Sequence, residues 1–138
     1  MKQRGLIVWV LATSGCLLGG CGGDGLNRVP VAGNVTLNGK PLADGSITFF
    51  PAGEGVSVGG KIVEGTYEIP RASGPIPGTY QVHITAVEPT GETITEAGGI
   101  EVPRMRSVVP PRYNFQSELT AKVTAEGPNR FDFKLESQ

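Results

Sequence analysis

Apolar and polar side chains alternate with a period of two in several short runs of this chain, and this alternation constrains its fold more than any other feature. The clearest run covers residues 79–87. Its apolar side chains occupy every second position: Tyr80, Val82, Ile84 and Ala86. Similar runs occupy residues 31–38, 61–69, 119–126 and 131–136. Successive side chains of a strand point to opposite faces, so each run predicts a β-strand with one buried face.

Turn-forming residues separate these runs. Glu64-Gly65 predicts a tight hairpin within residues 61–69, and Gly127-Pro128-Asn129 predicts a second hairpin that pairs residues 119–126 with 131–136. Every predicted strand has one polar face, so we expect antiparallel sheets that are solvated on the outside. With no helical period after residue 21, the pattern predicts an all-β fold, an antiparallel, Ig-like β-sandwich of about seven strands over residues 29–138.

The N-terminus has a different character. Lys2 and Arg4 precede a mostly apolar stretch at residues 6–18, and small residues follow it. This order is typical of a secretory signal peptide, which we expect over residues 1–20. A membrane-spanning helix is the alternative, but thirteen residues at ~1.5 Å each reach only about 20 Å of a roughly 30 Å bilayer core.

The residues that end the apolar stretch are Leu18-Gly19-Gly20-Cys21, which resembles the lipobox of bacterial lipoproteins. The resemblance implies cleavage before Cys21 and transfer of diacylglycerol to its thiol, and the new amino group can be acylated as well, for example with palmitate. Cys16 is a second candidate, with a shorter apolar stretch before it. Two or three acyl chains anchor a small domain stably. We therefore expect an exported domain held on a cell-envelope membrane, with residues 21–28 as the lipidated cysteine and a Gly-rich tether.

Charge and cysteine content restrict the partners of such a mature chain. Cleavage leaves 138 − 20 = 118 residues, enough for one domain. Removing two of twelve cations leaves ten against thirteen acidic residues, a net charge of −3. Binding of phosphate backbones requires a basic excess, so nucleic acid is not an expected partner. Lipidation of Cys21 would leave no free thiol and no disulfide.

Three motifs then resemble the carboxypeptidase regulatory-like domain, a transthyretin-like (prealbumin-like) sandwich. They are GNVTLNGKPLADG at residues 33–45, EGTYEI at 64–69 and IPGTYQV at 76–82. The match covers roughly residues 29–87. The last third of the chain resembles small bacterial lipoproteins that carry this domain. The resemblance implies the fold but no assigned activity.

No catalytic or metal-binding set emerges from the sequence. His83 is the single histidine and lies on the polar face of its strand, so we expect a surface side chain with a local hydrogen bond. Ureide hydrolases of transthyretin-like fold use paired histidines and a C-terminal Tyr-Arg-Gly-Ser, which this chain lacks. The carboxylates are scattered and form no calcium loop. We expect no enzyme activity, no metal and no cofactor.

The most specific functional hypothesis from the sequence concerns residues 88–118. They contain no clear long strand, and loops of about thirty residues are uncommon unless they are functional. Arginine and tyrosine are enriched at binding surfaces, and this region has four such candidates for partner binding: Arg104, Arg106, Arg112 and Tyr113. An anionic partner fits them, although nearby glutamates could neutralise the arginines. The alternative is that residues 100–102 and 107–109 are short edge strands.

Three functional classes are compatible with these observations. The leading one is a lipid-anchored envelope protein whose sandwich is a non-catalytic binding or structural module, with an envelope protein or a glycan as partner. The second is an accessory domain of a larger envelope complex. The third is an unrecognised hydrolase, and no residue pattern in the sequence supports it.

Overall fold

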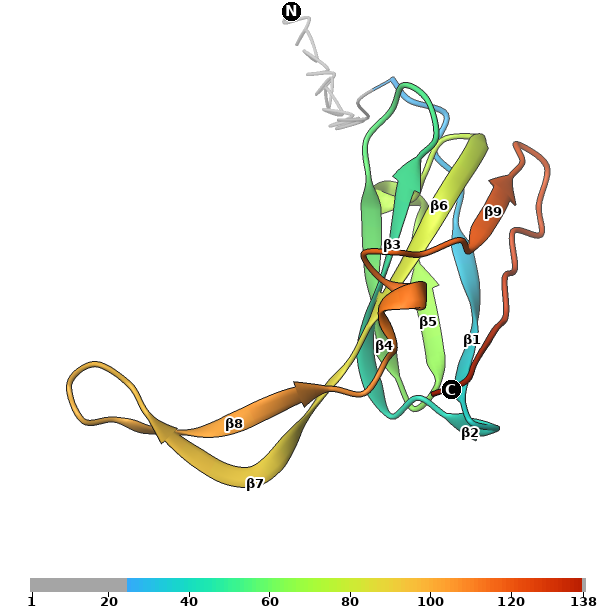
Figure 1. Ribbon diagram of the computed structural model, residues 1–138. Coiled ribbons are helices and arrows are strands. Elements are labelled where there is room, and N and C mark those ends of the chain that lie inside the picture. Colours follow the sequence, from blue (N-terminus) through green and yellow to red (C-terminus); the bar gives the residue numbers. More distant parts are fainter. Residues whose placement is uncertain (1–24, 138) are drawn as a thin grey trace, which may run out of the picture.

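The computed structural model describes residues 25–137 (Figure 1), so the predicted signal peptide and Cys21 lie outside the described residues. The described chain forms ten strands and two short 3₁₀ helices. They are β1 (Val31–Leu37), β2 (Lys40–Pro41), β3 (Asp44–Pro51), β4 (Val58–Val63), β5 (Thr66–Ile69), η1 (Arg71–Ser73), β6 (Gly78–Thr85), β7 (Val87–Thr95), β8 (Glu101–Ser107), η2 (Pro111–Tyr113), β9 (Thr120–Val123) and β10 (Phe133–Leu135).

Eight of these strands build one curled sheet. Its order is β10-β1-β5-β4-β3-β6-β9, and β2 pairs with β1 outside this path. Neighbouring strands are antiparallel except β1 and β10, which are parallel. The two remaining strands, β7 and β8, pair only with each other and project from the curled sheet (Figure 1). We call the curled sheet with its loops the body and residues 87–107 the arm. The all-β prediction is confirmed.

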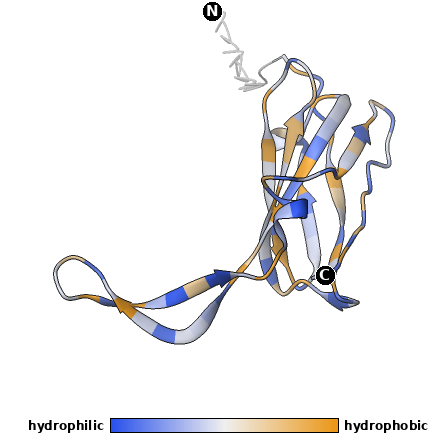
Figure 2. Ribbon diagram, viewed as in Figure 1, coloured by the Kyte–Doolittle hydropathy of each residue, from blue (hydrophilic) through white to orange (hydrophobic). Residues whose placement is uncertain are grey.

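A single hydrophobic core lies inside the curl of the body. The alternation that predicted the strands also selects the core, because the four alternating apolar residues of 79–87 are all buried. Phe49 occupies the centre, with its ring centroid 6.2 Å from that of Tyr67 and 6.3 Å from that of Tyr80. In Figure 2 apolar segments alternate with pale and hydrophilic ones along the strands of the body, and the arm also carries several strongly hydrophilic positions.

The turn between β4 and β5 shows how the sequence sets the register. Glu64 and Gly65 have φ angles of 50° and 75°. Two successive positive φ angles are typical of the type I′ turn, whose twist matches that of the flanking strands. Ile62 consequently lies opposite Tyr67. The predicted hairpin within residues 61–69 is confirmed.

The predicted pairing of residues 119–126 with 131–136 is wrong. Here β9 pairs with β6, antiparallel, and β10 pairs with β1, parallel, at opposite edges of the sheet. The segment between them crosses the open side of the curl instead of turning back. Asn129 fixes this crossing: its carbonyl accepts a hydrogen bond from the Ala32 N–H at 3.1 Å, and its side-chain oxygen accepts one from the Thr124 N–H at 2.8 Å. The parallel pairing of β10 with β1 also corrects the expectation that the sheets are purely antiparallel.

A glycine permits this crossing segment to approach β1. A Cβ atom on Gly33 would lie 1.8 Å from the carbonyl oxygen of Phe131, so only glycine leaves room for that carbonyl. The same oxygen accepts a hydrogen bond from the Tyr67 hydroxyl at 2.7 Å. Burial raises the pKa of Tyr67 well above its ordinary value, and the nearby Asp132 carboxylate raises it further.

The described end of the predicted tether is fastened to the body. The Arg28 guanidinium donates to the Gly74 carbonyl at 2.8 Å, and the Arg28 carbonyl accepts from Arg71 at 2.9 Å. Leu26 lies beside a small hollow of about 120 Å³ that is also lined by Val56 and Ile76. The chain therefore enters the body at the end where the loop between β3 and β4 and the start of β6 lie.

Candidate functional site: a projecting arm and the hollows at its base

Residues 88–118 are not the loop that the sequence suggested. Their first two thirds form the arm, a long hairpin of β7 and β8 whose residues are almost all exposed. The expected short strand at residues 100–102 lies at the start of β8, whereas residues 108 and 109 follow its end. An isolated two-stranded hairpin is only marginally stable in water. Among the described residues, the arm is thus the segment that is least stabilised by packing against the rest of the chain. It is therefore the leading candidate for a contact surface.

The register of the hairpin gives the arm two different faces. Val87 pairs with Ser107, Pro89 with Met105, and Thr93 with Pro103. Directly opposed residues lie on the same face of a sheet. These pairs therefore gather apolar side chains on one face of the arm, which we call the apolar face: Val87, Pro89, Pro103 and Met105. Val87 is 58% exposed and Met105 is 50% exposed, so nothing in the described chain covers this face.

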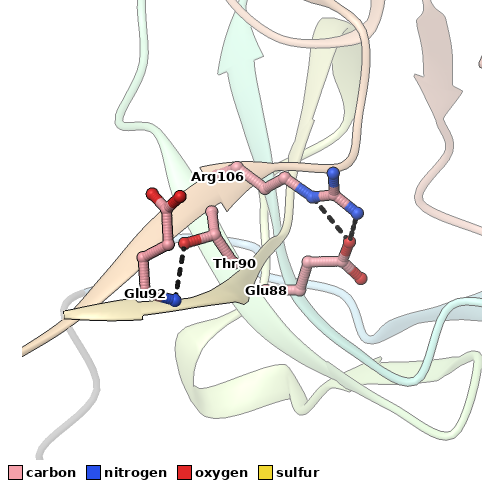
Figure 3. Close-up of polar contacts among 4 residues, drawn as sticks. All are labelled: Glu88, Thr90, Glu92 and Arg106. Carbon is pink, nitrogen blue, oxygen red and sulfur yellow. Dashed lines mark hydrogen bonds and ion pairs between the residues drawn. The ribbon is translucent and has the colours of Figure 1, made fainter.

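The opposite face, which we call the charged face, carries two ion pairs near the body. Glu88 lies opposite Arg106 in the register, and its Oε1 accepts from Arg106 Nε at 2.8 Å (Figure 3). The Glu92 carboxylate accepts from Arg104 at 3.1 Å. Farther toward the tip, this face carries Ile94, which is 46% exposed.

An irregularity separates the two ion pairs along β7. The register shifts between Pro89 and Thr93, so that β7 has two more residues there than β8. Gly91 within this bulge has a φ of 85°, and the Thr90 hydroxyl accepts a hydrogen bond from the Glu92 N–H at 3.3 Å (Figure 3). Bulges bend a strand and increase its twist. The shift restores the same two faces beyond the bulge, because Thr93 again lies opposite an apolar-face residue of β8.

A proline occupies the outer edge of β7. The Ala86 carbonyl accepts a hydrogen bond from the Val108 N–H at 3.1 Å at the base of the arm. Hydrogen-bonded and non-bonded pairs alternate along an antiparallel ladder, so the pair of Pro89 and Met105 is a non-bonded one. The backbone nitrogen of Pro89 therefore faces outward, where it supplies no N–H group.

A second proline does the same on β8. At the tip of the arm the Glu96 N–H donates to the Ile100 carbonyl at 2.9 Å. Alternation from this pair places the nitrogen of Pro103 on the outer edge of β8. Proline on an exposed edge discourages the addition of another strand. Both exposed edges of the arm are therefore poorly suited to pairing with another strand.

The four residues proposed for partner binding do not come together. Arg104 and Arg106 lie on the charged face of the arm, paired with glutamates. Arg112 and Tyr113 lie on the body in η2, where the Arg112 guanidinium is 5.0 Å from the centre of the Tyr113 ring. Arg112 also donates to the Glu136 carbonyl at 2.6 Å, and the Tyr113 hydroxyl accepts from the Glu136 N–H at 3.2 Å. This second pair fastens the segment after β10.

Two shallow hollows flank the base of the arm. One, of about 610 Å³, lies over β3 and β4, where Gly59 and Gly60 leave space. The other, of about 770 Å³, lies between β6 and the segment that contains Val108 and Phe115. Thr85 lines both. The lining of the second hollow includes Val108, Val109 and Phe115, and Phe115 is 72% exposed.

His83 borders the second hollow and behaves as the alternation predicted. It points to the outer face of the sheet, where its Nε2 lies 3.2 Å from the Gln81 side-chain oxygen and its ring lies 4.5 Å from that of Phe50. The local hydrogen bond is confirmed. Among the described residues, no group of three or more histidine, cysteine, aspartate or glutamate side chains could hold a metal ion. Within the same part of the chain, no helix has the length and apolar character needed to cross a bilayer.

The sequence contains only a weak signal for the arm and its apolar face. The bulge keeps the period of two, but Thr90, Gly91, Thr93 and Thr95 give β7 no apolar alternation beyond Pro89. The recognisable signal was Gly98-Gly99 between two short β-prone runs, which is a hairpin pattern.

Comparison with known proteins adds no family. No protein-family profile matches the chain, and no curated protein sequence matches it. Among solved structures the chain is similar to a 9R-lipoxygenase from Cyanothece PCC8801, with 14% sequence identity and a TM-score of 0.36. The aligned region covers 80% of this chain and 16% of the lipoxygenase chain. A similarity this weak carries no argument about activity.

Proposed function

We propose that this chain is a lipid-anchored protein of a bacterial cell envelope whose β domain is a non-catalytic binding or structural module. The observation that carries the second half of this proposal is the arm. It is a long hairpin with an exposed apolar face, and its prolines discourage edge-to-edge pairing. The hairpin packs little against the body, so it gains little stability there. Contact with another molecule best explains its exposed apolar face.

The anchor half of the proposal is supported by the sequence and by the position of residue 26. The apolar stretch and the Leu18-Gly19-Gly20-Cys21 motif imply lipidation at Cys21, which is only a few residues before Leu26. Leu26 lies at one end of the body, and β6 runs from that end to the base of the arm (Figure 1). Eight residues at ~3.3 Å each span about 26 Å. The arm would therefore stand clear of the anchoring bilayer and meet a partner above it.

We also infer that the body is a transthyretin-like sandwich of the carboxypeptidase regulatory-like type. The three motifs that resemble this domain coincide with structural features of the body. Residues 38 and 39 form a turn with positive φ angles, residues 64 and 65 form the type I′ turn, and Gly78 begins β6. Agreement of the motifs with two turns and one strand start supports the resemblance.

Replacement of the lipidated cysteine tests the anchor. Cys21→Ser should move the protein from the membrane fraction to the soluble exported fraction, whereas Cys16→Ser should leave it membrane-bound. Mass spectrometry of the mature N-terminus should find a diacylglyceryl cysteine at residue 21. Retention of Cys21→Ser in membranes with its N-terminus intact would contradict the proposal and indicate a spanning helix.

A further inference from the structure

We propose that the second hollow binds a neutral glycan, with the exposed ring of Phe115 as the surface on which a sugar stacks. The inference deepens the proposed function and rests on its binding-module part, because it names a ligand class for that module. The place is separate from the apolar face of the arm. Residues 83 and 85 of β6 line one part of the hollow, and residues between 107 and 115 line another.

Two exposed phenylalanine rings meet at this hollow. Among the described aromatic residues, Phe50 and Phe115 are the two most exposed, at 39% and 72%. Both border His83: the ring of Phe50 lies 4.5 Å from the His83 ring, and Phe115 lines the second hollow together with His83. Single exposed apolar side chains are ordinary, but exposed apolar groups that gather at one place mark interaction sites.

The loop that presents Phe115 is fastened to the body. Ser117 is 3% exposed, and its hydroxyl donates a hydrogen bond to the Val82 carbonyl. The Gln81 side-chain amide donates to the Ser117 carbonyl, and the Phe115 N–H donates to the Asn114 side-chain oxygen. A ring that is held in solvent by a fastened loop loses little conformational freedom when a ligand binds. The loop therefore presents Phe115 in advance of binding.

The polar side chains of the hollow carry hydroxyl, amide and imidazole groups. They belong to His83, Thr85, Ser107, Asn114 and Ser137. Among the described residues that line the hollow, none is aspartate, glutamate, lysine or arginine. Hydroxyl and amide groups both donate and accept hydrogen bonds. A charged ligand group would lose hydration here without gaining an ion pair. The lining therefore favours a neutral ligand that also both donates and accepts.

A sugar ring has this combination of properties. The C–H groups of a pyranose form an apolar face that packs on an aromatic ring, and its hydroxyls form a neutral rim of donors and acceptors. The volume of the hollow, about 770 Å³, lies within the range of roughly 300–1,000 Å³ that is typical of small-molecule sites. A short neutral oligosaccharide fits this volume and this chemistry.

An extended peptide is the competing ligand, and the edge of β6 disfavours it. Beside the hollow the Val82 N–H donates to the Leu119 carbonyl at 2.8 Å, and the Ala86 carbonyl accepts from the Val108 N–H at 3.1 Å. Alternate residues of a strand face the same edge, so only Ile84 lies between these two bonds on that edge. Addition of a peptide strand requires a longer open edge.

Saturation-transfer NMR of the full chain, held in a detergent without a sugar head group, tests this inference. The probes are maltotriose, cellotriose and triacetylchitotriose, with trigalacturonate as the anionic comparison and oligoproline as the peptide comparison. Saturation of the aromatic protons of the protein should reach the ring C–H groups of at least one neutral trisaccharide. That sugar should bind more tightly than trigalacturonate.

Two variants of the hollow and one control locate the binding. Phe115→Ala should weaken the sugar at least about five-fold, because aromatic stacking contributes on the order of 1 kcal/mol. Thr85→Val keeps the shape of the side chain but removes its hydroxyl, and should weaken binding at least about three-fold. Val56→Ala is the control, because Val56 is 62% exposed and lines the small hollow near Leu26 instead; it should leave the affinity unchanged.

Four outcomes would overturn the glycan. They are no transfer to any neutral trisaccharide at about 10 mM, an affinity unchanged by Phe115→Ala, tighter binding of trigalacturonate, and binding of oligoproline in place of the sugars. Each of these contradicts only this inference, since membrane fractionation of Cys21→Ser reports the anchor separately. Cleavage of a bound trisaccharide during the titration would instead contradict the non-catalytic part of the proposed function.

Discussion

Removal of the Phe133 side chain tests the parallel docking of β10 on β1. Phe133 is 8% exposed and lies opposite Val35, within the core of the body. A buried phenylalanine removes about 150 Å² from water, which at ~25 cal/mol per Å² corresponds to roughly 4 kcal/mol. This agrees with the roughly 3–5 kcal/mol observed for Phe→Ala in cores. We therefore expect Phe133→Ala to lower the free energy of unfolding by about 3–5 kcal/mol.

The measurement uses residues 25–138, because the body has its own core. Thermal unfolding followed by circular dichroism should show a loss of at least about 12 °C, since 1 kcal/mol shifts the midpoint of a domain this size by roughly 4 °C. Lys134→Ala is the matched control, because Lys134 is the exposed neighbour on the same strand and its loss should cost less than about 0.5 kcal/mol. If both variants unfold within 1 kcal/mol of the parent, β10 is not docked on β1.

Two further predictions concern pH and charge. Burial raises the pKa of Tyr67 above its ordinary value of 10.0, so the stability that the neutral hydroxyl contributes is complete below pH 10 and is lost as the pH rises above 10. Tyr67→Phe should therefore have a lower free energy of unfolding than the parent at pH 7. In urea titrations above pH 10, the free energy of unfolding of the variant should fall less steeply with pH than that of the parent. A decline as steep as that of the parent would contradict this assignment. Arg104→Ala combined with Arg106→Ala should change the free energy of unfolding by less than about 1 kcal/mol, because both ion pairs are exposed. A larger loss of stability in urea titrations would contradict this expectation.

The sequence predicted the strands of the body well because each strand has one buried and one solvated face. Burial then follows a period of two, which is visible in the order of residues. The hairpin at Glu64-Gly65 was predictable for a different reason, since its turn requires two residues that tolerate positive φ. Both signals are local in the chain.

The choice of partners for β9 and β10 is not local, and it was predicted wrongly. Alternation shows that residues 119–126 and 131–136 are extended, but two adjacent extended runs can pair with each other or with other strands. The turn residues between them favoured a hairpin. The Asn129 carbonyl accepts a hydrogen bond from the Ala32 N–H, which lies far away in the sequence, and this bond holds the crossing segment on β1. No sequence pattern predicts such a long-range contact.

The candidate site was predicted only in part. Residues 104–113 were singled out for their arginines, and Arg104 and Arg106 do lie on the arm. The apolar face was missed because its members come from two strands and are aligned only by the register across a bulge. Exposed apolar residues scattered along a sequence carry no information until pairing brings them onto one surface.

The pairing of β1 with β10 has a consequence for how the body folds. Contacts across this pair join residues about one hundred positions apart, such as the hydrogen bond from the Asn34 N–H to the Asp132 carboxylate with a sequence separation of 98. Contacts of such long range slow folding, because the chain must close a large loop before it gains them. While the chain is synthesised from its N-terminus, β1 lacks one neighbour until β10 emerges. The sheet can therefore be completed only after the whole domain has been synthesised, and until then one edge of β1 stays open to pairing with other strands.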